Sequence, residues 1–237
     1  MPANRYFTSQ ELSLGSAIAL EPVEALHLKT VMRNEVGDSV EIINGKGALG
    51  YATVEEISKK SVVLKIVHLE YFPKPRDCTL GIGLLVQERL DLLLEKGCEL
   101  GLTKICLIRM QNTTKGGFTD GQIERMQRVL IASLKQSGRF WLPQIDLVSS
   151  LEDFLQEDIN VYFGDVDSSS PPFFEVFDLT SPFKLLIGPA KGFTKEEIHL
   201  LNQRKNAIGV YLSDAILRAE TAAILLLGLA NHSFLLK

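Results

Sequence analysis

The sequence has few of the residues that build metal sites and disulfide frameworks. Its 237 residues include three cysteines and four histidines. Because Cys78, Cys98 and Cys106 are odd in number and never form a C-x-x-C pair, we expect reduced, buried thiols rather than disulfides or a zinc knuckle. The histidines lie far apart and have neither H-x-x-x-H nor H-E-x-x-H spacing, so the sequence predicts no metal site.

Long hydrophobic runs are also missing. The longest apolar run, Ala222 to Ala230, is about half as long as a helix needs to be to cross a bilayer. The first residues, MPANRYFTSQEL, contain no apolar segment behind a basic start and so show no secretory signal. With 46% hydrophobic and 23% charged residues, the composition is that of a globular protein, which we expect in the cytoplasm, with no membrane partner.

The chain has no overall excess of positive charge. A formal net charge of −4 argues against a protein that coats nucleic acid, because such proteins displace counterions with a basic surface. Between residues 104 and 139, however, seven basic residues stand against two acidic ones. This basic stripe is typical of either a solvated helix face with its loop or a phosphate-facing surface. Its members are Lys104, Arg109, Lys115, Arg125, Arg128, Lys135 and Arg139.

The first part of the chain has the pattern of a small β-structure. Residues 38–43, 49–57 and 61–69 alternate apolar and polar side chains and are rich in β-branched residues, which predicts half-buried strands. The stretch NGKG at 44–47 predicts a hairpin turn between the first two. Residues 22–33 have helical spacing. Together these elements predict a small β-barrel or curled sheet with one helix.

A change of pattern divides the chain. Two prolines in YFPKPRD, residues 71–77, disfavour both helix and central strand, so we place a boundary there and predict domains at 1–72 and 73–237. Beyond it, apolar strands alternate with helices, which predicts an α/β domain with a parallel sheet covered on both faces. Ligands bind such sheets at the carboxyl ends of the strands, which directs attention to the loops after Ile187 and Leu212.

The first of these loops lies in LLIGPAKGFTKEEI, residues 185–198. It is not a Walker loop, because Phe193 follows Gly192 where that motif requires lysine, and it lacks the Rossmann glycine pattern. Thr194 and Glu197 have the spacing of a capping box, which predicts a helix start. From these residues alone, the loop is either an ordinary strand-to-helix corner or one wall of a ligand site.

The second loop lies in LSDAILRAETAAILLLGLA, residues 212–230. Ser213 and Asp214 are plausible helix N-caps, and Arg218 and Glu220 precede a run that is apolar on all sides. Such a helix must be buried on every face, in a core or against another subunit. A local ion pair or a cap also explains the two charges, although a spacing of two places them on different faces.

Taken together, the two loops resemble I-G-P-E-G-G-F-[ST]-x-x-E and L-G-x-R-I-L-R-x-E-T-A of the RsmE family, the small-subunit ribosomal RNA uridine N3-methyltransferases of the SPOUT superfamily. Three further stretches match that family in the same order, and five separated matches identify the chain as a member. The further stretches are HLKTVMRNEVGDSVEIINGKG, ERLDLLLEKGCELGL and ERMQRVLIASLKQSGRFWLP.

The resemblance implies a fold and an activity. It implies an N-terminal PUA-like β-barrel that binds RNA, a C-terminal SPOUT-type α/β domain with a trefoil knot, and a homodimer. S-adenosyl-L-methionine would be the cofactor, bound in the knot loops. The substrate would be 16S rRNA in the assembled small ribosomal subunit, methylated at N3 of uridine 1498 in 16S rRNA numbering.

Residue by residue, the resemblance assigns three roles. Arg218 would hold the target nucleotide by a phosphate or carbonyl, while Glu220 and Thr221 would shape or polarise the catalytic site; no residue is assigned as the base that takes the N3 proton. The cofactor-binding residues would be Gly188, Pro189, Gly192, Leu212, Ser213, Ile216 and Leu217. The RNA-binding residues would be Arg5, Arg33, Arg125 and Arg139.

The cofactor loops depart from the family pattern at a few positions. Ala190 replaces Glu, Lys191 and Ser213 each replace Gly, and Ala215 replaces a usual Arg. Lys191 brings a positive charge close to a pocket for a positively charged sulfonium. An RNA-binding relative with weakened or lost methyl transfer is therefore an alternative, as is a methyltransferase acting on another RNA or another atom.

Overall fold

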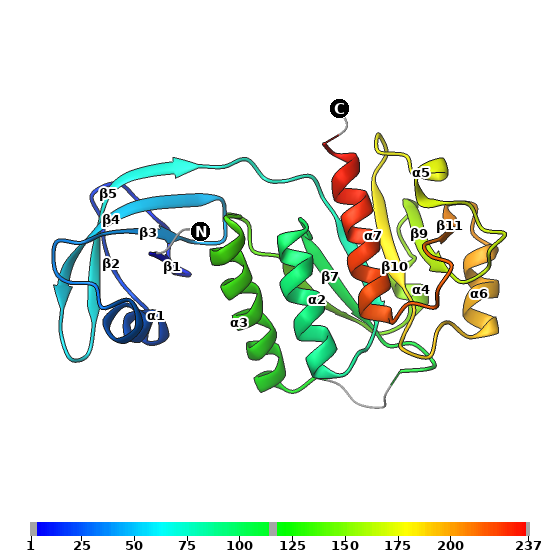
Figure 1. Cartoon of the computed structure of the whole chain (residues 1–237), viewed down its shortest axis with the longest axis horizontal. Coiled ribbons are helices and arrows are strands. Elements are labelled where there is room, and N and C mark those ends of the chain that lie inside the picture. The colour runs from blue at the N-terminus through cyan, green and yellow to red at the C-terminus, as the bar shows by residue number, and fades with distance from the viewer. Residues whose placement is uncertain (1–3, 114–117, 236–237) are drawn as a thin grey trace. The chain divides into compact units, whose positions relative to one another are not determined.

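The computed structural model describes residues 4–113 and 118–235 of the chain, which form two compact units (Figure 1). The first unit combines the residues up to Pro75 with Ile131–Leu142, and the second holds Arg76–Leu130 and the chain from Pro143 onward. The domain limit at residue 72 stays a prediction, and the return of 131–142 to the first unit has no signal in the sequence.

The first unit is a five-stranded sheet with a short helical segment. The strand order is β1-β3-β4-β5-β2, with β1 parallel to β3 and the other pairs antiparallel. The three long strands confirm the predicted ones, whereas the two three-residue strands had no sequence signal. The predicted helix is divided into a short α-helix and a π-helix. The elements are β1 (Arg5–Phe7), β2 (Ala17–Ala19), α1 (Pro22–Leu26), η1 (His27–Met32), β3 (Ser39–Ile43), β4 (Ala48–Ile57) and β5 (Val62–Tyr71).

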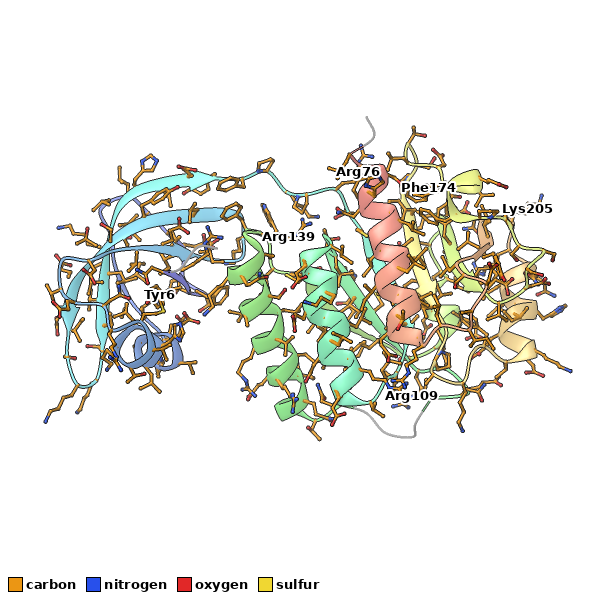
Figure 2. All side chains as sticks on the ribbon, in the orientation of Figure 1. Tyr6, Arg76, Arg109, Arg139, Phe174 and Lys205 are labelled. Carbon is orange, nitrogen blue, oxygen red and sulfur yellow. The ribbon has the colours of Figure 1, made fainter. Side chains whose placement is uncertain are left out.

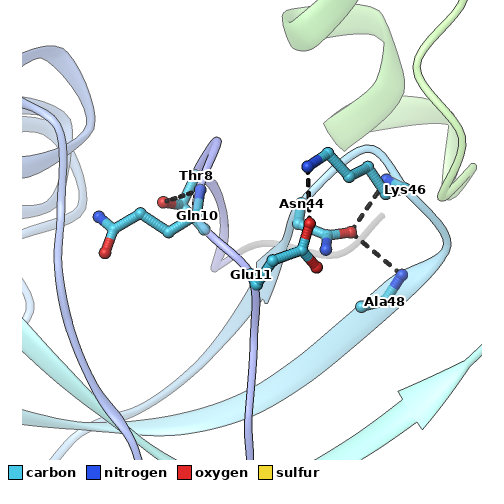
Figure 3. Close-up of polar contacts among 6 residues, drawn as sticks. All are labelled: Thr8, Gln10, Glu11, Asn44, Lys46 and Ala48. Atoms are coloured by element: carbon cyan, nitrogen blue, oxygen red, sulfur yellow. Dashed lines mark hydrogen bonds and ion pairs between the residues drawn. The ribbon is translucent and has the colours of Figure 1, made fainter.

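The predicted hairpin turn joins β3 to β4 (Figure 3). The side-chain oxygen of Asn44 accepts hydrogen bonds from the backbone N–H groups of Lys46, at 2.9 Å, and Ala48, at 3.2 Å. Both glycines of the turn have positive φ, which residues with a Cβ rarely adopt. Lys46 Nζ lies 2.6 Å from Glu11 Oε1, an ion pair that links the turn to the segment between β1 and β2. The residues of NGKG therefore fix the turn locally.

The second unit is a six-stranded sheet whose strands are all parallel, as the alternating pattern predicts. The strand order is β11-β9-β10-β6-β7-β8. No helix among the described residues is long and apolar enough to cross a membrane. The strands are β6 (Thr79–Gly83), β7 (Lys104–Ile108), β8 (Gln144–Val148), β9 (Asn160–Asp165), β10 (Phe183–Ile187) and β11 (Ala207–Tyr211). The helices are α2 (Gln87–Glu99), the part of α3 (Asp120–Ser137) up to Leu130, α4 (Leu151–Phe154), α5 (Phe173–Val176), α6 (Lys195–Asn202) and α7 (Ala219–Ser233). The rest of α3 belongs to the first unit.

The last helix packs on one side only. Helix α7 lies beside α2 (Figure 1), and its side chains Ala223, Leu226 and Leu227 are fully buried. Ile224 and Leu225 are only partly buried within the single chain. An apolar helix with half-exposed side chains of this kind could pack against a second subunit. The homodimer stays a prediction, and this face of α7 is the surface that it would use. The trefoil knot likewise stays a prediction.

Candidate functional site

A cavity of about 660 Å³ lies at the carboxyl ends of three adjacent strands in the second unit. Because β9 lies between β10 and β11, the loops that follow all three strands meet at this edge of the sheet. The lining comes from residues 164–167, 187–193 and 211–217, and from side chains of α6 and α7. This is where parallel α/β sheets bind ligands.

All seven predicted cofactor-binding residues line this cavity, although they come from two separate loops. The three predicted catalytic residues do not line it. Ala219 and Ala222 present the first turn of α7 to the cavity, so Arg218, Glu220 and Thr221 lie beside the cavity wall along the chain. The residues brought together are Gly188, Pro189, Gly192, Leu212, Ser213, Ile216 and Leu217.

The end of β9 contributes lining residues that the sequence analysis missed. Gly164, Asp165, Val166 and Asp167 form one side of the cavity. The signal was present, because INVYFGD, residues 159–165, is one of the apolar stretches that alternate with helices in this part of the chain, and its last residues therefore stand at a carboxyl end. Only the position of β9 between the two loop-bearing strands, however, brings that end to the cavity.

The turn from Gly188 to Gly192, which lines the cavity, is held by close backbone packing. The N–H of Gly192 donates to the carbonyl of Pro189 at 2.8 Å, and Gly192 has a φ of 76°. A Cβ on Gly83, at the end of β6, would lie only 2.6 Å from the backbone nitrogen of Pro189. Gly83 is therefore a further missed residue, because it lets the turn lie directly against the neighbouring strand.

The predicted capping box is confirmed. Thr194 Oγ1 accepts from the N–H of Glu197 at 3.2 Å, and Glu197 Oε2 accepts from the N–H of Thr194 at 2.8 Å. The other carboxylate oxygen of this buried glutamate accepts from the N–H of Gln111 at 3.0 Å. Asn112 also donates to the carbonyl of Gly192, at 3.2 Å. The helix start thus also ties the loop after β7 to the cavity turn.

Charged side chains of both signs line the cavity. Asp165, Asp167 and Asp214 supply three carboxylates, and Lys191 supplies one ammonium. Hydrogen bonds from the backbone and hydroxyl of Ser169 lower the pKa of Asp167, so this carboxyl is charged at neutral pH. Lys191 forms no hydrogen bond or ion pair with any residue in the described part of the chain.

Glu220 faces α2 rather than solvent. It is 4% exposed, and its Oε1 lies 3.6 Å from Nε of Arg89. Its Oε2 is buried and has no hydrogen-bond partner within residues 4–113 and 118–235. Arg218 and Thr221 are exposed, and Arg218 occupies the N-cap of α7 without a side-chain capping bond. Arg89 is a further missed residue, since it is distant from Glu220 in the sequence.

Two of the predicted RNA-binding arginines belong to the β-structure. Arg5 is largely buried, lies 2.6 Å from Glu41, and stacks over the ring of Phe140 with its guanidinium carbon 5.4 Å from the ring centre. This position favours a role in stabilising the fold. Arg33 is exposed at the end of the π-helix, with a φ of 56°. Its predicted contact with RNA stays open to test.

The basic stripe is largely matched by acidic side chains. Four of its members face carboxylates at 2.5–3.8 Å, and three of those carboxylates come from outside the stretch. Arg139 is partly buried, and Arg109 is exposed just after β7 (Figure 2). Lys115 lies outside the described residues. The four pairs are Lys104 with Asp146, Arg125 with Asp91, Arg128 with Glu124, and Lys135 with Glu24.

Comparison with protein families gives two matches that cover most of the chain. The model of an RNA methyltransferase domain matches residues 72–231, and the model of an RNA methyltransferase PUA domain matches residues 23–67. A protein of Rickettsia conorii named ribosomal RNA small subunit methyltransferase E is 29% identical over 94% of this chain and 93% of its own length. The protein of the same name from Buchnera aphidicola is 23% identical over 93% and 89%.

Solved structures share the fold. A ribosomal RNA small subunit methyltransferase E from Neisseria gonorrhoeae, bound to S-adenosyl methionine, superposes with a TM-score of 0.86 at 22% identity, covering 98% of both chains. A putative methyltransferase from Legionella pneumophila, in complex with the same cofactor, gives 0.86 at 23% identity and 97% coverage of both. The predicted fold class, a PUA-like barrel and a SPOUT-type α/β domain, is confirmed. The chain therefore belongs to the RNA methyltransferase family, and its resemblance to the RsmE family is confirmed.

Proposed function

We propose that this protein binds S-adenosyl-L-methionine in the cavity and methylates N3 of uridine 1498 of 16S rRNA in the assembled small ribosomal subunit. One observation carries the proposal: the seven residues expected to bind the cofactor, from two separate loops, line a single cavity. The names of the Rickettsia and Buchnera relatives support a small-subunit rRNA substrate. The Neisseria and Legionella structures, described with the cofactor bound, support its identity.

The cavity fits this cofactor in size and chemistry. Its volume of about 660 Å³ is in the range of small-molecule sites. Leu212, Ile216 and Leu217 offer an apolar surface for adenine, and the turn from Gly188 to Gly192 offers backbone groups. The three lining carboxylates suit a ligand that bears positive charge. When bound, the cofactor supplies a methyl group on a positively charged sulfur.

The reaction asks two things of the protein, which are to position the uracil and to let its N3 proton leave. Arg218 is exposed next to the cavity wall, and its planar donor group suits a phosphate or a uracil carbonyl. Glu220 is turned toward Arg89, so we assign it an indirect role in which it orients that arginine. Thr221 is exposed on the same turn of α7 and would shape the entrance. No residue is assigned as the base.

The proposal includes the partners of the protein. A homodimer would cover the partly buried apolar side chains of α7, and the PUA-like unit would bind 16S rRNA. Arg33, Arg125 and Arg139 remain the proposed RNA contacts, whereas we assign Arg5, which contacts Glu41 and Phe140, a role in stabilising the fold. The protein would act in the cytoplasm on assembled subunits.

The test is mass spectrometry of 16S rRNA from a strain that lacks the gene. We expect one 3-methyluridine to disappear, to return with the unaltered protein, and to stay absent with Arg218→Ala. The matched control is Lys205→Ala, a change at an exposed residue outside the cavity lining, which should restore the modification. An unchanged 3-methyluridine content in the deletion strain would refute the substrate.

Two outcomes point to the alternatives instead. A different modified nucleotide disappearing from the deletion strain indicates another RNA or another atom as substrate. No binding of S-adenosylmethionine to the purified protein in calorimetry indicates an RNA-binding relative that has lost methyl transfer. Both measurements use the full chain.

A further inference from the structure

Lys191 is an unmatched cation in a cavity that is otherwise acidic. Its side chain is exposed, and it makes no hydrogen bond or ion pair with any described residue. Three carboxylates line the same cavity, at Asp165, Asp167 and Asp214, yet none of them pairs with this lysine. An ammonium has three N–H donors, and no described residue accepts a hydrogen bond from those of Lys191.

The carboxylates have local partners instead. Asp165 accepts from the hydroxyl of Ser170 at 2.9 Å and from the N–H of Asp167 at 3.1 Å. Asp167 in turn accepts from the N–H of Ser169 at 2.9 Å. These hydrogen bonds give the carboxylates of Asp165 and Asp167 donors close to the end of β9, so neither carboxylate depends on Lys191 for a partner. The ammonium is therefore available for an anionic group of a ligand.

The lining carries charges of both signs, as the proposed cofactor does, and the acidic groups are in excess where the cofactor has an excess of positive charge. S-adenosylmethionine carries two positive groups, the sulfonium and the amine, and one negative group, the carboxylate of its methionine part. Like charges repel each other at close range, so the ammonium of Lys191 would avoid the sulfonium. A flexible four-carbon side chain can instead reach the carboxylate end.

We propose that Lys191 binds the carboxylate of the methionine part of the cofactor and so makes the cavity selective for ligands that keep this part. The inference rests on the proposed function, because it takes S-adenosylmethionine as the ligand. The RsmE pattern has glycine at this position, so the contact distinguishes this chain from the pattern of its family. What looks like an unfavourable substitution becomes a specificity-determining residue.

The test is calorimetry with three ligands on the full-length protein and on Lys191→Ala. The ligands are S-adenosylmethionine, S-adenosylhomocysteine, which keeps the carboxylate but has no sulfonium charge, and 5′-methylthioadenosine, which has no amino acid part. We expect the variant to bind the first two about tenfold more weakly, the loss of a charge-assisted hydrogen bond, and to bind the third as the unaltered protein does. Lys191→Arg should retain most of the affinity, because it keeps a cation.

The control and the contrary outcomes separate this inference from the proposed function. Lys195→Ala removes a lysine from the first residue of α6, which does not line the cavity, and should change no affinity. Tighter binding of S-adenosylmethionine to Lys191→Ala, with S-adenosylhomocysteine unchanged, would mean that the lysine only repels the sulfonium and would overturn the inference. Equal losses for all three ligands would overturn it as well, by indicating a distorted turn. An unaltered protein that binds none of the three refutes the proposed function itself.

Discussion

The closest backbone approach at the cavity provides a direct test of its geometry. In Gly83→Ala, the new Cβ would lie 2.6 Å from the nitrogen of Pro189 and 2.7 Å from its Cα. Carbon atoms at an ordinary contact are about 3.5–4.0 Å apart, so the strand and the turn must separate by roughly 1 Å. Because this turn lines the cavity, the substitution should disturb both stability and ligand binding.

The size of the effect follows from the crowding. Inserting a methyl group into a closely packed site costs about 1–3 kcal/mol of unfolding free energy. For a protein of this length, a loss of about 2 kcal/mol lowers the melting temperature by roughly 4–8 °C. The displaced turn should also weaken the binding of S-adenosylmethionine by about tenfold, or ~1.4 kcal/mol. Thermal unfolding and calorimetry measure the two effects separately.

A matched glycine serves as the control. A Cβ on Gly121, in the first turn of α3, would meet nothing within 4 Å, and this residue has no positive φ. Gly121→Ala should leave binding unchanged and alter stability by less than about 1 kcal/mol, in the stabilising direction, since alanine is the better helix former. If Gly83→Ala melted and bound the cofactor as the unaltered protein does, the described packing of Pro189 against β6 would be wrong.

Two further predictions concern buried polar groups. Arg89→Ala leaves the buried carboxylate of Glu220 without the cation that faces it at 3.6 Å. We expect this variant to lower the free energy of unfolding by about 1–3 kcal/mol. Adding Glu220→Gln to the same chain should restore much of that loss, because it removes the unpaired charge. Urea unfolding of the two single variants and the double variant measures this coupling, and strictly additive losses would disprove it. Burial raises the pKa of Tyr6 to about 12, and the nearby carboxylates of Glu24 and Asp38 add to this shift. As the pH rises, this tyrosine therefore ionises in the unfolded chain before it ionises in the native protein. The native state should lose stability between about pH 10 and about pH 12. In Tyr6→Phe, which also loses the hydrogen bond to Asn34, this part of the alkaline loss should be absent from unfolding curves recorded between those pH values.

The features that the sequence predicted best are encoded over a few residues. The capping box depends on two side chains three positions apart, and both of its hydrogen bonds are present. The hairpin turn depends on Asn44 and two glycines, and α3 is one of the helices that were expected to alternate with the strands. In each case the donor, the acceptor or the helical period lies within one turn of chain. Such patterns can be recognised in the sequence without knowledge of the tertiary fold.

Predicting the cavity required information that is not encoded within one short stretch of sequence. The residues of the loop after β10 favour an ordinary corner when taken alone. The ends of the strands point to this loop and to the loop after β11, but only the resemblance to a family assigns both to one cofactor site. The contribution of Asp165 and Asp167 follows from the order of the strands, which places β9 between the other two. The pairing of Arg89 with Glu220 follows from the packing of α2 on α7. Neither relation has a local signature in the sequence.

The basic stripe shows how far a count of charges along the chain differs from the charge that a ligand meets. The count predicted a local excess of positive charge, but Asp91, Asp146 and Glu24 reach the stripe from elsewhere in the fold and pair with its cations. A cation already paired with a carboxylate contributes less to binding phosphate, because the pair must first be broken or shared. Attraction for RNA should therefore depend less on the length of the stripe than on exposed arginines that the fold leaves unpaired within its described part, among them Arg33 and Arg218. This places the proposed grip on the target nucleotide beside the cavity, where the methyl group would be supplied.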